Sequence, residues 1–219
     1  MHFPLWLRAA AFLLLCSAWV PGSAWADDEP KMLFIEYELV AFGVPPDSFA
    51  AKPKKLWRVG DSHLRLEELP NPEAKEQRLL VVAEPDIWII NRTTGLGRHE
   101  IDPGPTYRVK FPVFTADKNE DVVKLEMGSE VQFFRDHDAR DAGEKTVADV
   151  ACKESVIELG GHQVSLFTRV ADGTPYQVTI LVGEYALAVR YLRYETGLAV
   201  DKDLFTPPAD IKFEEPKQP

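Results

Sequence analysis

The sequence predicts a mainly β fold with one or two α-helices, in which an incomplete antiparallel β-barrel, a half-barrel, wraps round a helix. Three observations support this prediction. Short apolar runs recur at an even spacing with turn residues between them, which is typical of an antiparallel sheet. One long segment, residues 119–139, has helical periodicity. Several strands carry apolar residues on both faces, so we expect the sheet to curve and partly close.

The first 26 residues resemble a secretory signal peptide. Arg8 precedes the apolar run of residues 9–20, and small residues at Ala24 and Ala26 suit a signal peptidase. The run is too short to span about 30 Å of hydrocarbon as a helix. We therefore expect residues 1–26 to be removed and residues 27–219 to form a single periplasmic domain, the alternative being an uncleaved anchor.

The overall composition excludes some classes of protein. The 219 residues include 25 Lys and Arg against 35 Asp and Glu, giving a formal net charge of −10, and 45% are hydrophobic. Without a dense basic cluster, nucleic acid is not an expected partner. Cys152 is the single cysteine after the signal segment, so the fold must depend on its core rather than on an internal disulfide. We also expect the protein to be a monomer.

The first half of the chain contains six predicted strands. They are residues 32–42, 55–59, 63–68, 79–83, 86–91 and 98–101. Gly60 and Asp61 separate two of these runs, which is a hairpin signal. The segment 119–139 then has apolar residues three, four and seven positions apart, with Asn119 as a plausible N-cap and Gly128 as a weak point near its centre.

The second half returns to strands joined by glycine turns. The predicted strands are residues 146–150, 155–159, 162–170, 176–182 and 185–194. A stiff element at residues 204–208 follows, and the chain then ends in a frayed tail. Evenly spaced short strands favour one antiparallel meander.

The apolar surface of these strands is larger than one helix can cover. Residues 79–83 and 87–90 are apolar on both faces, and residues 185–194 nearly so. A helix of about six turns covers one face at most. The rest of the apolar wall would line a pocket or a partner-binding groove. A sandwich folded onto itself with a packed core is an equally good interpretation.

A pattern of strands and turns over most of residues 32–215 resembles the LolA/LolB-type periplasmic domains. The matching pieces are Leu56-Trp57, Gly60-Asp61, residues 79–82, residues 86–90, Gly161-His162, residues 172–175, the strand through Tyr191 and residues 203–208. The chain is identified as a divergent member of that superfamily. The resemblance implies a half-barrel round helices with a hydrophobic cavity for acyl chains. The lid-holding basic residue of the family stands before a proline, whereas here Arg58 precedes Val59 and Gly60, so that role is not transferred.

Six large apolar residues are the candidate ligand-binding lining of the cavity. They are Phe34, Trp57, Trp88, Phe133, Phe134 and Tyr191. Large apolar side chains without a polar pattern suit alkyl chains, which offer area but no hydrogen bonds. Ordinary core packing is the alternative for each of them.

No catalytic residue, metal site or cofactor is predicted. Asp136, His137 and Asp138, with Asp141, would point about 100° apart on a helix and would not converge on one ion. Cys152 has an apolar flank and reads as a buried, inert thiol.

The sequence therefore predicts a non-enzymatic periplasmic protein that holds a lipid or an acylated lipoprotein in a hydrophobic half-barrel. The alternative is an envelope sensor or scaffold that binds another protein through the same surface. Bound lipid would favour the first, and a packed barrel with an exposed apolar edge would favour the second.

Overall fold

The computed structural model describes residues 30–41, 43–102, 104, 110–111, 124–182 and 184–214. The predicted signal peptide, the domain start at residue 27 and the Asn119 cap lie outside these residues. The strands are β1 (Met32–Ala41), β2 (Lys54–Val59), β3 (His63–Glu68), β4 (Arg78–Ala83), β5 (Asp86–Asn91), β6 (Leu96–Ile101), β7 (Arg140–Val147), β8 (Val150–Leu159), β9 (His162–Arg169), β10 (Pro175–Val182), β11 (Tyr185–Leu198) and β12 (Lys212–Glu214). The helices are the 3-10 turns η1 (Phe49–Ala51) and η3 (Lys202–Phe205) and the α-helix α2 (Glu130–Asp136).

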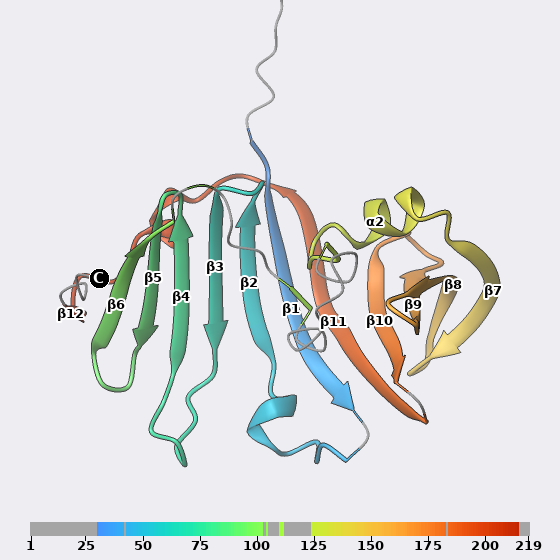
Figure 1. The fold of residues 1–219 in the computed structure, drawn as a ribbon, viewed down its shortest axis with the longest axis horizontal. Coiled ribbons are helices and arrows are strands. Elements are labelled where there is room, and N and C mark those ends of the chain that lie inside the picture. The colour runs from blue at the N-terminus through green and yellow to red at the C-terminus, as the bar shows by residue number, and fades with distance from the viewer. Residues whose placement is uncertain are drawn as a thin grey trace, which may run out of the picture.

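All twelve strands form one open sheet. Their order is β12-β6-β5-β4-β3-β2-β1-β11-β10-β9-β8-β7, so β1 joins the two meanders by pairing with β11. Every pair is antiparallel except β12 with β6. The sheet curls at its β7–β10 end, where α2 lies above it (Figure 1). The predicted mainly β, incomplete barrel is therefore confirmed.

Most of the predicted strands and turns are present, including the β2–β3 hairpin about Gly60 and Asp61. The start of the second meander is different. Residues 146–150 were expected as one strand, but Ala148 and Asp149 form the turn between β7 and β8, with φ values of 43° and 66°. Alanine rarely adopts positive φ, so sequence alone gives no signal for a turn there.

The prediction of one helix over residues 119–139 is wrong in the described part. Only residues 130–136 are helical, and Glu126 instead pairs with Lys110 in an isolated β-bridge. Gly128 has a φ of +96°, which no α-helix contains. Among the described residues of this segment, Leu125, Met127, Phe133 and Phe134 are buried against the sheet, whereas Val131 is exposed.

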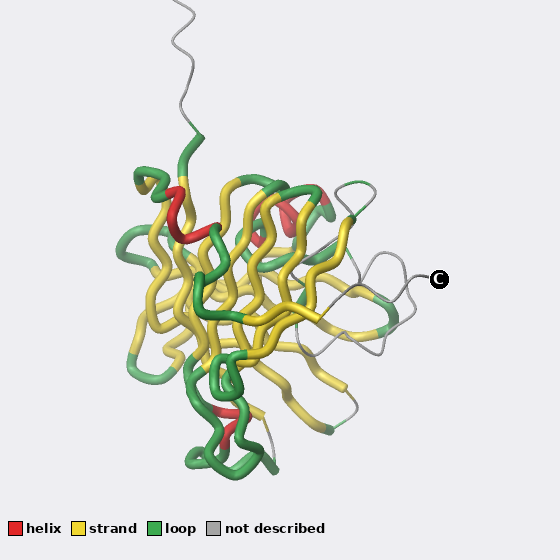
Figure 2. Tube along the Cα trace, turned by 90° about the vertical axis from the view of Figure 1, so that its left-hand side faces the viewer, coloured by secondary structure: helices red, strands yellow, loops and turns green. Residues whose placement is uncertain are grey.

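The two faces of the sheet are covered by different parts of the chain. We call the face that packs against α2 the inner face, and residues 110–111 and 124–139 the cover segment. The opposite, outer face of β2–β5 packs against residues 199–211, the C-terminal strap. In Figure 2, η3 and the loop after it run along the outside of the strands. The strap accounts for apolar surface that the sequence analysis could not assign to a partner.

Candidate functional site

The inner face and its cover segment enclose the main hydrophobic core. The sheet contributes residues such as Ile35, Leu56 and Val178, each fully buried. The cover segment contributes five side chains with at most 7% exposure: Phe111, Leu125, Met127, Phe133 and Phe134. The space between the cover segment and the sheet is therefore filled by the protein's own side chains, and not only by those of α2.

Gly128 lets the cover segment approach the sheet closely. A Cβ at this position would lie 2.3 Å from the Cδ2 atom of Leu33 on β1, and the φ of +96° is one that residues with a Cβ rarely adopt. Glycine is needed here for two separate reasons, backbone conformation and space. The close approach of Gly128 to Leu33 therefore holds the start of α2 near β1.

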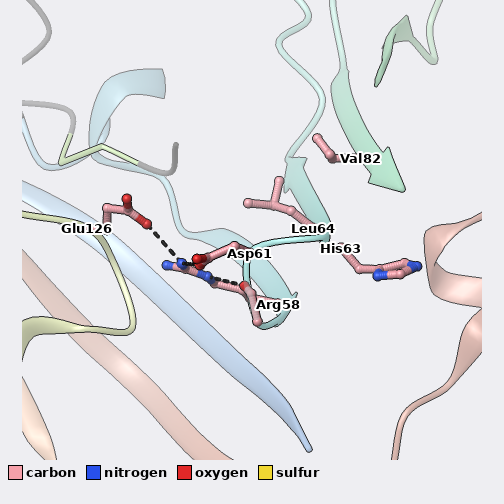
Figure 3. A pocket seen from close by; sticks show the side chains of 7 residues that line it. Arg58, Asp61, His63, Leu64, Val82 and Glu126 are labelled. Carbon is pink, nitrogen blue, oxygen red and sulfur yellow. Dashed lines mark hydrogen bonds and ion pairs between the residues drawn. The ribbon is translucent and has the colours of Figure 1, made fainter. Parts of the chain in front are cut away.

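Arg58 ties the cover segment to β2 through charge. Its Nη1 donates to the carbonyl oxygen of Met127 at 3.0 Å, and its Nη2 lies 2.9 Å from the Oε2 of Glu126 and 2.6 Å from the Oδ1 of Asp61. Figure 3 shows the guanidinium between the two carboxylates, with His63 pointing away towards the C-terminal part of the chain. The cavity beside Arg58 has a volume of only about 10 Å³, room for one water molecule at most.

Glu130 is a second polar tie, and it is completely buried at the first residue of α2. Its carboxyl group accepts hydrogen bonds from the hydroxyl of Tyr191, from the hydroxyl of Tyr194 at 3.1 Å and from the backbone N–H of Gly128 at 2.8 Å. Burial raises the pKa of Glu130, although these donors oppose the rise. Burial and the nearby Glu130 raise the pKa values of both tyrosines, so their hydroxyls stay protonated.

Beyond the cover segment, an apolar row crosses the inner face from strand to strand. Leu56, Leu66, Leu80 and Ile89 are direct cross-strand partners on β2, β3, β4 and β5, and Arg98 on β6 continues the row. Exposure rises along it, from 0% at Leu56 to 40% at Ile89, with Leu66 and Leu80 half-buried. At about 4.8 Å per strand, the four apolar residues extend over about 14 Å. This row is an accessible apolar track that ends beside a cation.

The six residues predicted to line a cavity lie on both faces of the sheet. Phe133, Phe134 and Tyr191 belong to the inner core. Phe34 and Trp57 stack on the outer face, with ring centroids 5.1 Å apart, and Trp88 packs near Ile211 of the strap. Neighbouring residues of a strand point to opposite faces, which is why the set divides. The structure therefore brings together three of the six, and their contact with a ligand stays a prediction.

The sequence analysis missed the three residues of the apolar row beyond Leu56, and it missed the buried Glu130. A signal exists for Leu66, which occupies an alternating apolar position of its strand, whereas Leu80 and Ile89 lie in runs that are apolar on both faces. The pairing register that aligns them is not readable from one sequence. Glu130 looked like an ordinary charged residue of a helix.

The described residues show no metal cluster of three or more His, Cys, Asp or Glu. The Nδ1–H of His137 donates a hydrogen bond to the Phe133 carbonyl oxygen at 2.8 Å, and the His137 ring stacks on the Phe133 ring. Cys152 is fully buried, and burial raises the pKa of its thiol. Of the helices in the described ranges, none has the length and apolar character to cross a membrane.

Comparison with known proteins gives only structural similarity. No family model matches the chain, and no curated protein matches it. An uncharacterized conserved protein from Thermus thermophilus is similar with a TM-score of 0.48 and 12% identity over 84% of this chain and 89% of that chain. The MucA/MucB complex of Pseudomonas aeruginosa is similar with a TM-score of 0.44 and 14% identity, over 83% of this chain and 57% of that chain. A LolA superfamily protein from Nitrosomonas europaea is similar with a TM-score of 0.31 and 9% identity, over 83% of this chain and 91% of that chain.

Proposed function

We propose that this chain is a non-enzymatic binding protein of the periplasm that holds the acyl chain of a lipid or an acylated lipoprotein against the inner face of its half-barrel. The observation that carries the proposal is the apolar row Leu66, Leu80 and Ile89, which leaves the packed core and becomes exposed towards β5. An alkyl chain gains about 0.8 kcal/mol per buried CH₂, so a track of this length supports useful affinity without hydrogen bonds.

Movement of the cover segment away from the sheet would enlarge this track. It is held over the inner face by apolar packing and by two polar ties, Arg58 to Met127 and Glu126, and Glu130 to Tyr191 and Tyr194. A longer guest would occupy the positions of Phe133 and Phe134 once the segment moved aside. The net charge of −10 would keep the carrier from adhering to an anionic membrane surface.

Native mass spectrometry of the protein extracted gently from membranes tests the proposal. We expect a discrete added mass of lipid size on the native chain. Ile89→Asp should remove it, because a carboxylate would be placed in the acyl track. Ile101→Asp is the matched control: Ile101 is 62% exposed near the same sheet edge, but it pairs with Asp86 on the outer face. A clean apo mass in every preparation, or equal loss in both variants, would refute acyl binding on this row.

A protein partner is the second candidate, and the dense packing under the cover segment favours it. In this case the exposed Ile89 and Leu96, at 40% and 46%, would be an interaction surface rather than the start of a cavity. A specific protein retained by the native chain and by Ile101→Asp, but lost from Ile89→Asp, with no lipid mass in any sample, would support this alternative.

A further inference from the structure

A separate cavity lies on the outer face, between the sheet and the C-terminal strap. Its volume is about 570 Å³, within the range of small-molecule sites, which is roughly 300–1,000 Å³. The turn ends of β2, β3 and β4 form one wall, and the strap around η3 forms the other. The described residues that line it are Pro30, Val59, Ser62, His63, Ala83, Val200, Lys202, Phe205 and Thr206.

The floor of this cavity is apolar and firmly packed. Val59 and Phe205 are 7% and 5% exposed and belong to one cluster that also includes the half-buried Ala83 and Val200. The ring of His63 meets Phe205 edge-on, with centroids 5.3 Å apart and an interplanar angle of 73°. The floor is therefore fixed by contacts between sheet and strap.

The polar groups of the cavity suit a negative charge. Ser62, His63, Lys202 and Thr206 all offer donors, and no Asp or Glu is among the described lining residues, although the chain as a whole carries −10. The Ser62 hydroxyl lies 2.8 Å from the Nδ1 of His63, and when it donates there the neutral ring has its proton on Nε2. The neighbouring Asp201 carboxylate accepts from the N–H of Asp203, capping η3.

We propose that this outer cavity is a second binding site, which takes a single-chain amphiphile with an anionic head such as a carboxylate or a phosphate. The alkyl part would lie on Val59, Ala83 and Phe205. The head would meet Lys202 and the ring of His63. An isolated anion would leave the apolar floor unused, a neutral amphiphile would make no charge-assisted bond with Lys202, and a cationic one would meet Lys202 with a like charge. The site is on the opposite face from the acyl track and does not depend on it.

Isothermal titration calorimetry of the purified chain tests this, with four C10 probes (decanoate, decyl phosphate, decanol and decyltrimethylammonium) and inorganic phosphate. We expect both anions to bind, decanol to bind at least about tenfold more weakly, a difference of about 1.4 kcal/mol, and the cation not to bind. Lys202→Gln should weaken both anions about fivefold without affecting decanol. Lys212→Gln, an exposed lysine further along the chain, should have no effect.

Two blocking variants locate the site. Ala83→Trp should abolish decanoate binding by filling the floor, and Thr206→Trp should do so from the exposed rim without touching the sheet. Both variants are made in the Ile89→Asp chain, in which the acyl track is blocked. That parent chain should still bind decanoate at the outer cavity, which separates this site from the acyl track. Equal binding of decyltrimethylammonium, binding of inorganic phosphate alone, or decanoate binding that survives Thr206→Trp and Lys202→Gln would each overturn the proposal.

Discussion

The inner and outer faces of this sheet are both covered, and both covers combine apolar with polar contacts. The C-terminal strap buries Phe205 and Ile211 among side chains of the sheet, and its Leu204 carbonyl oxygen accepts a hydrogen bond from the Nη1 of Arg65 at 2.9 Å. The cover segment accepts an equivalent bond from Arg58 at the Met127 carbonyl oxygen, and it adds the ion pair of Glu126 with Arg58 and the buried, titratable Glu130. The ion pair and Glu130 depend on charge and pH, whereas apolar burial does not. The inner face is therefore the better candidate for a cover that moves.

The largest expected effect comes from forcing the cover segment away from β1. Gly128→Ala should lower the free energy of unfolding by about 3 kcal/mol, because the new Cβ would clash with Leu33 and the backbone would be strained. The matched control is Gly143→Ala, where φ is +84° but no atom lies within 4 Å. It should cost about 1 kcal/mol. Urea unfolding of both variants measures the difference, and equal costs would contradict the close contact.

The strap can be tested in the same way. Phe205→Ala should lower the free energy of unfolding by about 3 kcal/mol, since it leaves a cavity in the cluster formed with Met32 and Val59. Binding of an acyl chain at the inner face should not change. A variant that lost acyl binding while keeping most of its stability would mean that the two faces are not independent.

The sequence alone was enough to predict most of the strands, but not the cover segment or the C-terminal strap. The runs around Leu79–Ala83 and Asp86–Asn91 are β-rich and bounded by turns, so their prediction needed local information only. The role of the strap depends on reaching β4 and β5, more than a hundred residues earlier. The cover segment has helical spacing because most of its described apolar residues face the sheet, although only residues 130–136 are helical. Contacts with strands that are distant in the sequence therefore determine the positions of both the strap and the cover segment.

The candidate site was predicted only in part for the same reason. Tyr191, Phe133 and Phe134 lie together in the inner core, and their contact with a ligand stays a prediction. Trp57 and Trp88 are one residue out of phase with the inner positions Leu56 and Ile87, and a shift of one residue changes the face of a strand. Aromatic size alone does not specify the face.

A pH dependence distinguishes the titratable Glu130 of the cover segment from the contacts of the strap. Burial raises the folded-state pKa of Glu130 above the ordinary value of 4.5. The stability that this group contributes is complete below 4.5 and is lost as pH rises through the folded pKa. Glu130→Gln should therefore flatten the fall in the free energy of unfolding above that value, as measured by urea unfolding across a pH series. Asp136→Asn, an exposed change on the same helix, should not; parallel curves for the native chain and Glu130→Gln would refute the assignment.

The smallest expected effect on stability is at the acyl track. Ile89 is 40% exposed, so Ile89→Asp should change the free energy of unfolding by no more than about 0.5 kcal/mol. Thermal unfolding followed by circular dichroism measures this. A large loss of stability would show that Ile89 is a structural residue and would weaken its use as a binding probe.

Photo-crosslinking most directly tests the central claim that the inner face receives an alkyl chain. A fatty acid with a photoreactive diazirine near its methyl end would be bound to the full protein carrying Thr206→Trp, which blocks the outer cavity, then irradiated and mapped by peptide mass spectrometry. The account predicts labelled peptides from residues 78–91 and from residues 124–139, with labelling lost in Ile89→Asp and kept in Ile101→Asp. Labelling confined to residues 199–206 of the strap, or spread evenly over the surface, would contradict it.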